Sequence, residues 1–284
     1  MHQTTAPRAV DMRHLVDHFD ALFFDAYGVL VEHGGALPGA PELVAALNRE
    51  GVNYFIVTND ASRLTETAVR RFEGLGLPIS GERIVSSGDL IGPYFERNGL
   101  HGATCAVLGT QDSREYVRRA GGVIVPPSED MDLVVVSDDD DYPFLETVNA
   151  VISALFLRVE RGLTTRLLLP NPDLLYPRGR GVGLASGSVA LLIESALALR
   201  FPQRPELRFD RLGKPFAPIF EEACRRAGTR SAVMVGDQLE TDIRGARDFG
   251  LQSALVLTGI THPDEAVRGE VRPTYLLQSL DLSR

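Results

Sequence analysis

The sequence has little that would tie it to a membrane, to nucleic acid or to an oxidising compartment. No apolar run reaches the ~20 residues that a transmembrane helix requires. The first ten residues lack the hydrophobic core of a secretory signal. The formal net charge of −9 argues against DNA, RNA or an anionic membrane surface as the main partner. We therefore expect a cytoplasmic protein that binds neither nucleic acid nor a membrane.

Cysteine is also scarce, because the chain has only Cys105 and Cys224. Two cysteines do not make a disulfide framework in a chain of 284 residues, and their spacing matches no metal motif. We expect both to be small buried apolar side chains in a reducing environment.

What the chain does have is enough apolar sequence for a sizeable core. Apolar residues make up 44% of the composition, and the length suits one large domain or two ordinary ones.

Short apolar runs alternate with helical stretches along most of the chain. Continuous apolar runs are typical of strands that are buried on both faces of a parallel sheet. We predict strands at 21–24, 54–58, 105–108, 133–136, 166–169, 232–235 and 254–257, and helices at 143–157, 215–227 and 241–249. This alternation predicts a doubly wound α/β fold. Residues 89–185 contain strands and helices of their own, so we interpret them as a second domain inserted into a first domain of residues 1–88 and 186–284.

Polar residues follow three of the predicted strands. Asp25 ends the first run, Thr58 and Asn59 end the second, and Asp237 follows a late one. In an open parallel sheet, ligands bind at the carboxyl ends of the strands. These residues therefore predict one site.

Three local patterns indicate chemistry, and each also has a plain structural explanation. Asp25 could be an exposed carboxylate on a turn that Gly28 allows, or only a turn residue. Asp237 and Asp242 offer hard oxygen ligands of the kind that Mg²⁺ prefers, although Asp242 is also a good helix-capping residue. Lys214, just before a predicted helix, could neutralise a carboxylate and a phosphate, or could be an ordinary surface lysine.

The order of these patterns is more specific than any one of them. Asp25, Thr58-Asn59, Gly213-Lys214-Pro215 and Asp237 with Asp242 resemble the four motifs of the haloacid dehalogenase (HAD) superfamily. The stretch at 35–41, Asn171-Pro172-Asp173 and Gly187-Ser188 are similar to its subclass IIA, the NagD-like and p-nitrophenylphosphatase-like branch.

The resemblance implies a doubly wound HAD core with an inserted α/β cap, and a role for each motif. Asp25 would be the nucleophile that attacks phosphorus and forms an aspartyl-phosphate. Asp25, the backbone carbonyl of Tyr27, Asp237 and Asp242 would hold Mg²⁺. Thr58 and Asn59 would bind the phosphoryl oxygens, and Lys214 would offset their charge.

Tyr27 departs from the family pattern, in which a second Asp usually acts as general acid and base. A phenol can donate a proton but is a poor base at neutral pH, and losing such help typically costs ~10²–10⁴ in rate. Asp60 stands where this branch often has Asn. It is either a turn residue or a substitute base beside the phosphate-binding residues. Tyr27 also leaves open a weakened, binding or regulatory protein, and the Asp25-Ala-Tyr-Gly28 pattern leaves open a metal-independent 2-haloacid dehalogenase.

We therefore expect a Mg²⁺-dependent hydrolase acting on a small phosphorylated molecule. Second-rank candidates for substrate contact are His33, Asn171 and Asp173, whereas the acidic run 137–141 is interpreted as a solvated loop. The sequence does not identify the substrate, and it leaves a homodimer open.

Overall fold

The chain divides into two compact units, each with its own sheet. The computed structural model describes residues 6–32, 34–128, 130–178, 181–257 and 269–282. The first unit comprises residues 1–58, 65–85 and 214–284, and the second comprises 59–64 and 86–213.

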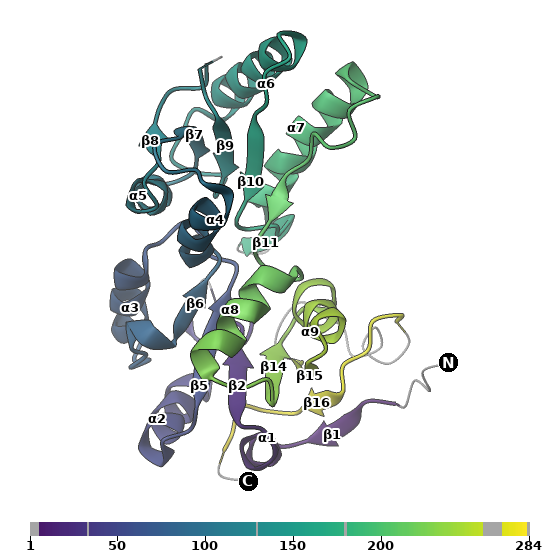
Figure 1. Ribbon diagram of the computed structural model, residues 1–284. Coiled ribbons are helices and arrows are strands. Elements are labelled where there is room, and N and C mark those ends of the chain that lie inside the picture. The colour runs from purple at the N-terminus through teal and green to yellow at the C-terminus, as the bar shows by residue number, and fades with distance from the viewer. Residues whose placement is uncertain (1–5, 33, 129, 179–180, 258–268, 283–284) are drawn as a thin grey trace. The chain divides into compact units, whose positions relative to one another are not determined.

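The first unit is built on an open sheet. Across the sheet, the strands are parallel from the edge strand β1 as far as β5. Its seven strands within the described residues run in the order β1 (Arg8–Val10), β16 (Tyr275–Leu277), β15 (Gln252–Val256), β14 (Ala232–Gly236), β2 (Ala21–Phe24), β5 (Tyr54–Thr58) and β6 (Ile84–Ser86) (Figure 1). Strand β2 lies between β14 and β5, with Phe24 opposite Val235 and Ile56. The predicted first, second and late strands are therefore neighbours.

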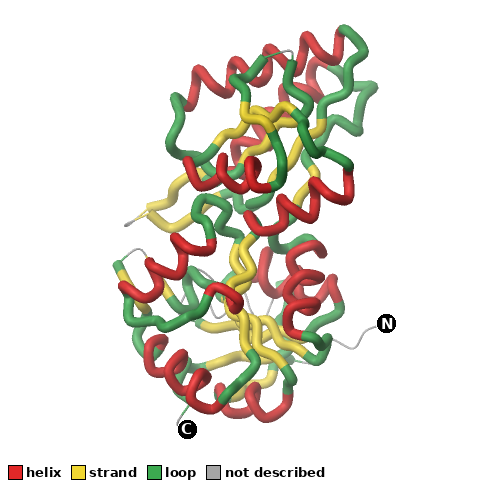
Figure 2. The backbone as a smooth tube through the Cα atoms, turned by 60° about the vertical axis from the view of Figure 1, so that its left-hand side comes forward, coloured by secondary structure: helices red, strands yellow, loops and turns green. Residues whose placement is uncertain are grey.

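Helices cover both faces of this sheet (Figure 2). They are α1 (Met12–His18), α2 (Ala40–Glu50), α3 (Thr65–Gly74), α8 (Ala217–Ala227) and α9 (Arg244–Phe249). On β2, Leu22 and Phe24 join the core beneath α1 and α2, whereas Phe23 faces the opposite side and contacts Phe55 edge-on. Burial of both faces explains why the strand is continuously apolar.

The second unit contains a smaller parallel sheet. Its order is β13 (Asp210–Arg211), β10 (Arg166–Leu169), β9 (Leu133–Val136), β7 (Thr104–Leu108) and β8 (Val123–Ile124). The accompanying helices are α4 (Ile91–Asn98), α5 (Gln111–Arg119), α6 (Phe144–Glu160) and α7 (Ser186–Arg200). A separate antiparallel hairpin joins β11 (Leu175–Arg178) to β12 (Gly181–Leu184).

The boundaries of the second unit differ from the predicted 89–185. The unit continues to Gly213, because Val189 and Ile193 of α7 belong to the same apolar core as Val134 of β9, and because β13 pairs with β10. No helix was predicted at the position of α7, and an apolar helix does not by itself indicate the sheet on which it packs. The linker 59–64 also belongs to this unit.

The predicted strands and helices are otherwise present. The helix expected at 241–249 begins earlier, as a π-helical turn over Leu239–Ile243 that continues into α9. Cys105 and Cys224 are free cysteines, and both are buried, as predicted. Within the described residues, no helix combines the length and apolarity needed to cross a bilayer.

Candidate active site

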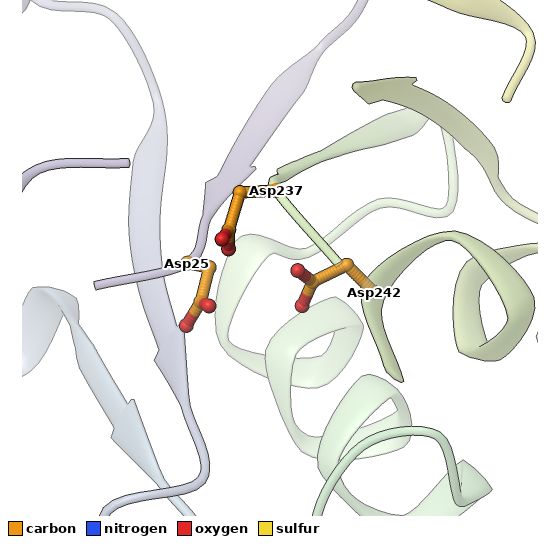
Figure 3. Close-up of side chains that lie close together, drawn as sticks. All are labelled: Asp25, Asp237 and Asp242. Atoms are coloured by element: carbon orange, nitrogen blue, oxygen red, sulfur yellow. The ribbon is translucent and has the colours of Figure 1, made fainter. Parts of the chain in front are cut away.

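Three aspartates from two neighbouring strand ends meet in the first unit. Asp25 follows β2, Asp237 follows β14, and Asp242 lies on the helical turn after β14 (Figure 3). One carboxylate oxygen from each lies within 4.8 Å of the others. All three side chains are buried. The sequence prediction that Asp25 and Asp237 share one site is consistent with this arrangement.

Two glycines allow the carboxylates to come this close. Gly28 has a φ of 82°, and a Cβ atom there would lie 2.3 Å from the Asp237 carboxylate. A Cβ atom on Gly236 would lie 2.3 Å from the Asp242 carboxylate. Gly28 was expected to permit a turn. Its second role, making room for Asp237, and the role of Gly236 could not be predicted because they depend on contacts between strands.

Lys214 joins two of the three carboxylates. Its Nζ lies 2.7 Å from Asp25 Oδ1 and 2.8 Å from Asp242 Oδ1, and the side chain is only 2% exposed. Asp25 Oδ1 also accepts a hydrogen bond from the backbone N–H of Ala26 at 2.7 Å. Lys214 is therefore a buried counter-charge and not a solvated surface lysine.

Burial and mutual charge dominate the electrostatics of this cluster. Burial raises the pKa of Asp25 well above its usual value, Lys214 opposes the rise, and Asp242 and Asp237 reinforce it. Burial by itself would lower the pKa of Lys214, but the charges of Asp242 and Asp25 more than compensate and raise it. The lysine is therefore firmly protonated.

The residues present fit a divalent cation. When all three carboxylates are ionised, they and the one ammonium would leave two negative charges in a buried space, which a doubly charged ion would balance. Oxygen donors from carboxylates are the set that Mg²⁺ and similar hard cations prefer. Without such an ion, burying the uncompensated negative charge of the cluster would cost folding free energy.

Asp242 caps the helical turn with one carboxylate oxygen and faces the cluster with the other. Its Oδ2 accepts a hydrogen bond from the backbone N–H of Gln238 at 3.1 Å, which holds the start of the helical turn. Its Oδ1 faces Lys214. The hydrogen bond that Asp242 Oδ2 accepts therefore orients Oδ1 towards the cluster.

Tyr27 is half-buried on the loop after Asp25, and a residue that the sequence did not indicate lies against it. The guanidinium carbon of Arg71 on α3 is 5.0 Å from the centre of the Tyr27 ring, which is cation–π geometry. The backbone of the same loop is fixed by a hydrogen bond from Gly28 N–H to the Val31 carbonyl at 2.9 Å. The tyrosine ring is thus held by packing on one face.

The residues of the second motif are divided between the two units. Thr58, 7% exposed, ends β5 in the first unit. Asn59, 4% exposed, belongs to the second unit and donates from Nδ2 to Asp173 Oδ1 at 2.8 Å. In the same unit, Asp60 Oδ1 accepts from the N–H and hydroxyl of Ser62, and its Oδ2 lies 2.8 Å from Arg63. These contacts favour a turn role for Asp60. His33 lies outside the described residues.

Two related family models match most of the sequence that forms the sheet of the first unit. Residues 22–122 match the haloacid dehalogenase-like hydrolase family, and residues 211–282 match a HAD-hydrolase-like family. The two matches contain the segments that carry Asp25, Thr58, Lys214, Asp237 and Asp242.

Similar proteins match over almost the whole chain. A dihydroxyacetone phosphatase of Corynebacterium glutamicum is 28% identical, and the match covers 90% of this chain and 87% of the relative. A solved protein of Cytophaga hutchinsonii, named as a possible sugar phosphatase of the HAD superfamily, is 32% identical with a TM-score of 0.83, and the match covers 96% and 98% of the two chains. The glycerol phosphate phosphatase of Mycobacterium tuberculosis, solved with magnesium, is 27% identical with a TM-score of 0.79, and the match covers 94% and 77%.

Proposed function

The chain belongs to the haloacid dehalogenase-like hydrolases, in their subclass IIA phosphatase branch, and on that premise we propose that it is a Mg²⁺-dependent phosphatase of small phosphate monoesters. The observation that carries the proposal is the cluster itself. Asp25, Asp237 and Asp242 converge in a buried space, with Lys214 bonded to two of them.

We assign the metal to these three carboxylates and the backbone carbonyl of Tyr27. When bound, the ion would neutralise the negative charge that gathers on the phosphoryl oxygens. The choice of a divalent ion is supported by the donor set and by the magnesium in the mycobacterial relative. We propose Mg²⁺ because it prefers oxygen ligands and retains water in its remaining positions.

Asp25 is the proposed nucleophile. Its carboxylate oxygen attacks phosphorus, the bond from phosphorus to the ester oxygen breaks, and the alcohol leaves. Water then attacks the aspartyl-phosphate, the bond between Asp25 and phosphorus breaks, and inorganic phosphate is released. Lys214 fixes one oxygen of Asp25, while Thr58 and Asn59 bind the phosphoryl oxygens.

Tyr27 is the proposed proton carrier in both steps. Its phenol would protonate the departing alkoxide, and the phenolate would recover a proton from the attacking water. We assign Asp60 no proton transfer, because Ser62 and Arg63 engage both of its carboxylate oxygens. Of the two alternatives for Asp60, we therefore propose the turn residue, which holds the loop after Asn59.

The second unit is the proposed cap, which selects the alcohol part of the substrate. Two relatives are named for three-carbon phosphates, so dihydroxyacetone phosphate and glycerol phosphate are the first natural candidates. Substitutions in the cap at positions other than Asn59 and its partner Asp173 should reorder the preference among phosphate esters and leave p-nitrophenyl phosphate hydrolysis in place.

The assay that tests the function uses p-nitrophenyl phosphate with Mg²⁺ or with EDTA. We expect wild-type turnover that needs the metal, and we expect Tyr27→Asp to raise it by about 10²-fold, because a carboxylate is a competent base at neutral pH. Turnover only in Tyr27→Asp would identify the alternative, a weakened HAD protein with a binding role. Metal-independent chloride release from a 2-chloro acid would support the dehalogenase instead.

A further inference from the structure

Asp173 in the second unit fixes the side-chain orientation of Asn59. The Asn59 amide nitrogen donates to Asp173 Oδ1 at 2.8 Å, and both residues belong to the second unit. An ionised carboxylate only accepts hydrogen bonds, so this contact determines which end of the amide is nitrogen. An amide nitrogen carries two N–H groups in one plane. Fixing the first therefore fixes the direction of the second.

The loop that carries Asp173 is itself braced on both sides. The Asp173 N–H donates to Asn171 Oδ1 at 2.9 Å, and the Asp173 carbonyl accepts from the Gly187 N–H at 2.9 Å. The Ser186 hydroxyl donates to the Asn171 carbonyl at 3.0 Å. A Cβ atom on Gly187 would lie 2.4 Å from the Pro172 carbonyl oxygen, so only glycine lets the start of α7 approach this closely.

Asn59 is held from two further sides. The Ser87 hydroxyl donates to the Asn59 carbonyl at 2.7 Å in a buried position. A Cβ atom on Gly213 would lie 2.4 Å from Asn59 Oδ1, and the Gly213 N–H donates to the Pro170 carbonyl at 2.9 Å. The glycine before Lys214 thus leaves room for the Asn59 carboxamide. These contacts give a structural role to Asn171-Pro172-Asp173 and to Gly187, to which the proposed chemistry gives no direct role.

We propose that Asp173 is a positioning residue for phosphoryl recognition and acts only through Asn59. This inference rests on the proposed function, because it takes Asn59 to be a phosphoryl-binding residue. Asp173 accepts a hydrogen bond from the Asn59 amide, and its own negative charge would repel phosphate. A charge-assisted hydrogen bond is roughly twice as strong as a neutral one, so the carboxylate is a better anchor than an amide would be.

A double-mutant cycle separates positioning from general support of the fold. We expect Asp173→Ala to lower kcat/KM for p-nitrophenyl phosphate by about 10- to 100-fold, and Asp173→Asn by only a few-fold, because its amide oxygen can still accept. Asn59→Ala should cause a loss of the same size as Asp173→Ala. The double variant should lose no more than Asn59→Ala alone. Losses that multiply in the double variant would overturn the inference.

A binding measurement tests the same idea without turnover. In wild type with Mg²⁺, inorganic phosphate should shift the side-chain amide resonances of Asn59 in a ¹H–¹⁵N spectrum. Asp173→Ala should weaken phosphate binding by about tenfold, and Asp173→Asn should bind nearly as wild type does. Asp139→Asn, on the same unit, is the matched control and should have no effect.

The two experiments fail in different ways. If phosphate shifts the Asn59 resonances and Asp173→Ala weakens its binding, but wild type hydrolyses no ester, the inference stands and the proposed hydrolysis fails. If wild type hydrolyses esters while phosphate leaves the Asn59 resonances unmoved, the phosphatase stands and the inference is overturned. If the Asp173→Ala variant does not fold, the Asp173→Asn variant is measured in its place. Asn59 side-chain amide resonances that are the same in Asp173→Asn as in wild type would also overturn the inference.

Discussion

Two acidic groups that follow buried parallel strands in this molecule differ in how their carboxylates are arranged. Asp25, Asp237 and Asp242 follow β2 and β14 in the first unit. Asp138 to Asp141 follow β9 in the second. The second group has more consecutive carboxylates, yet within the described residues only the first brings three of them together.

The difference lies in where the carboxylates point. In the second group, Asp138 accepts from the Asp139 N–H at 2.9 Å, and Asp140 accepts from the Asp141 N–H at 2.8 Å. Asp141 lies 3.1 Å from Arg114 near the surface. The carboxylates of Asp138, Asp140 and Asp141 therefore bind backbone N–H groups of their own loop or the guanidinium of Arg114. In the first group, residues distant in sequence converge and share the buried Lys214.

This comparison shows that acidic density in the sequence is a poor guide to where carboxylates converge. Convergence from neighbouring strands, a buried counter-charge and glycines that permit close approach distinguish the two groups. The predictions below test that distinction, beginning with the largest expected effect.

Removing one carboxylate from each group should affect catalysis very unequally. We expect Asp25→Asn to lower kcat for p-nitrophenyl phosphate by about 10⁴-fold or more, because the amide cannot serve as nucleophile. Asp140→Asn should remain within about twofold of wild type. Steady-state kinetics on both purified variants provide the measurement. Comparable losses would show that the distinction between the groups is wrong.

Removing one cation from each group should affect stability unequally. Lys214→Met should lower the free energy of unfolding by about 3–5 kcal/mol, because it leaves buried carboxylates uncompensated. Arg114→Met, which removes the surface partner of Asp141, should cost about 0–1 kcal/mol. Urea unfolding without metal measures both. A Lys214→Met loss as small as that of Arg114→Met would mean that the cluster is not charged as we describe.

The smallest expected effect is the pH dependence of stability that the second group contributes. Burial raises the pKa of Asp138 to about 7, with Asp139 and Asp60 adding to the rise. Between the unfolded value of about 3.9 and that value, the folded state holds a proton that the unfolded state has lost. Stability should therefore fall as pH rises through this window.

Asp138→Asn should remove this contribution. We expect the variant to be roughly 1 kcal/mol more stable than wild type at pH 8, after allowance for solvent screening, and nearly equal to it at pH 4. Urea titrations at the two pH values make the comparison. A constant difference at both would show that Asp138 does not titrate in this range.

The sequence predicted the sheet-forming runs because burial on both faces leaves a continuous apolar signal. It also predicted that Asp25, Asp237 and Asp242 are candidates for one site, since the ends of parallel strands meet at one edge. It could not predict that α7 belongs to the second unit, because an apolar helix does not indicate which sheet it covers. Likewise, the contacts of Arg71 with Tyr27 and of Asp173 with Asn59 arise only when distant segments meet.

The central claim is that Asp25 and Asp237 hold the same divalent cation. Crystals grown with Mn²⁺ in place of Mg²⁺, examined by anomalous scattering, test it directly. The account predicts one ion within about 2.0–2.4 Å of an oxygen from each of these two residues, with Asp242 beside it. An ion bound by Asp237 alone, or located away from Asp25, would contradict it.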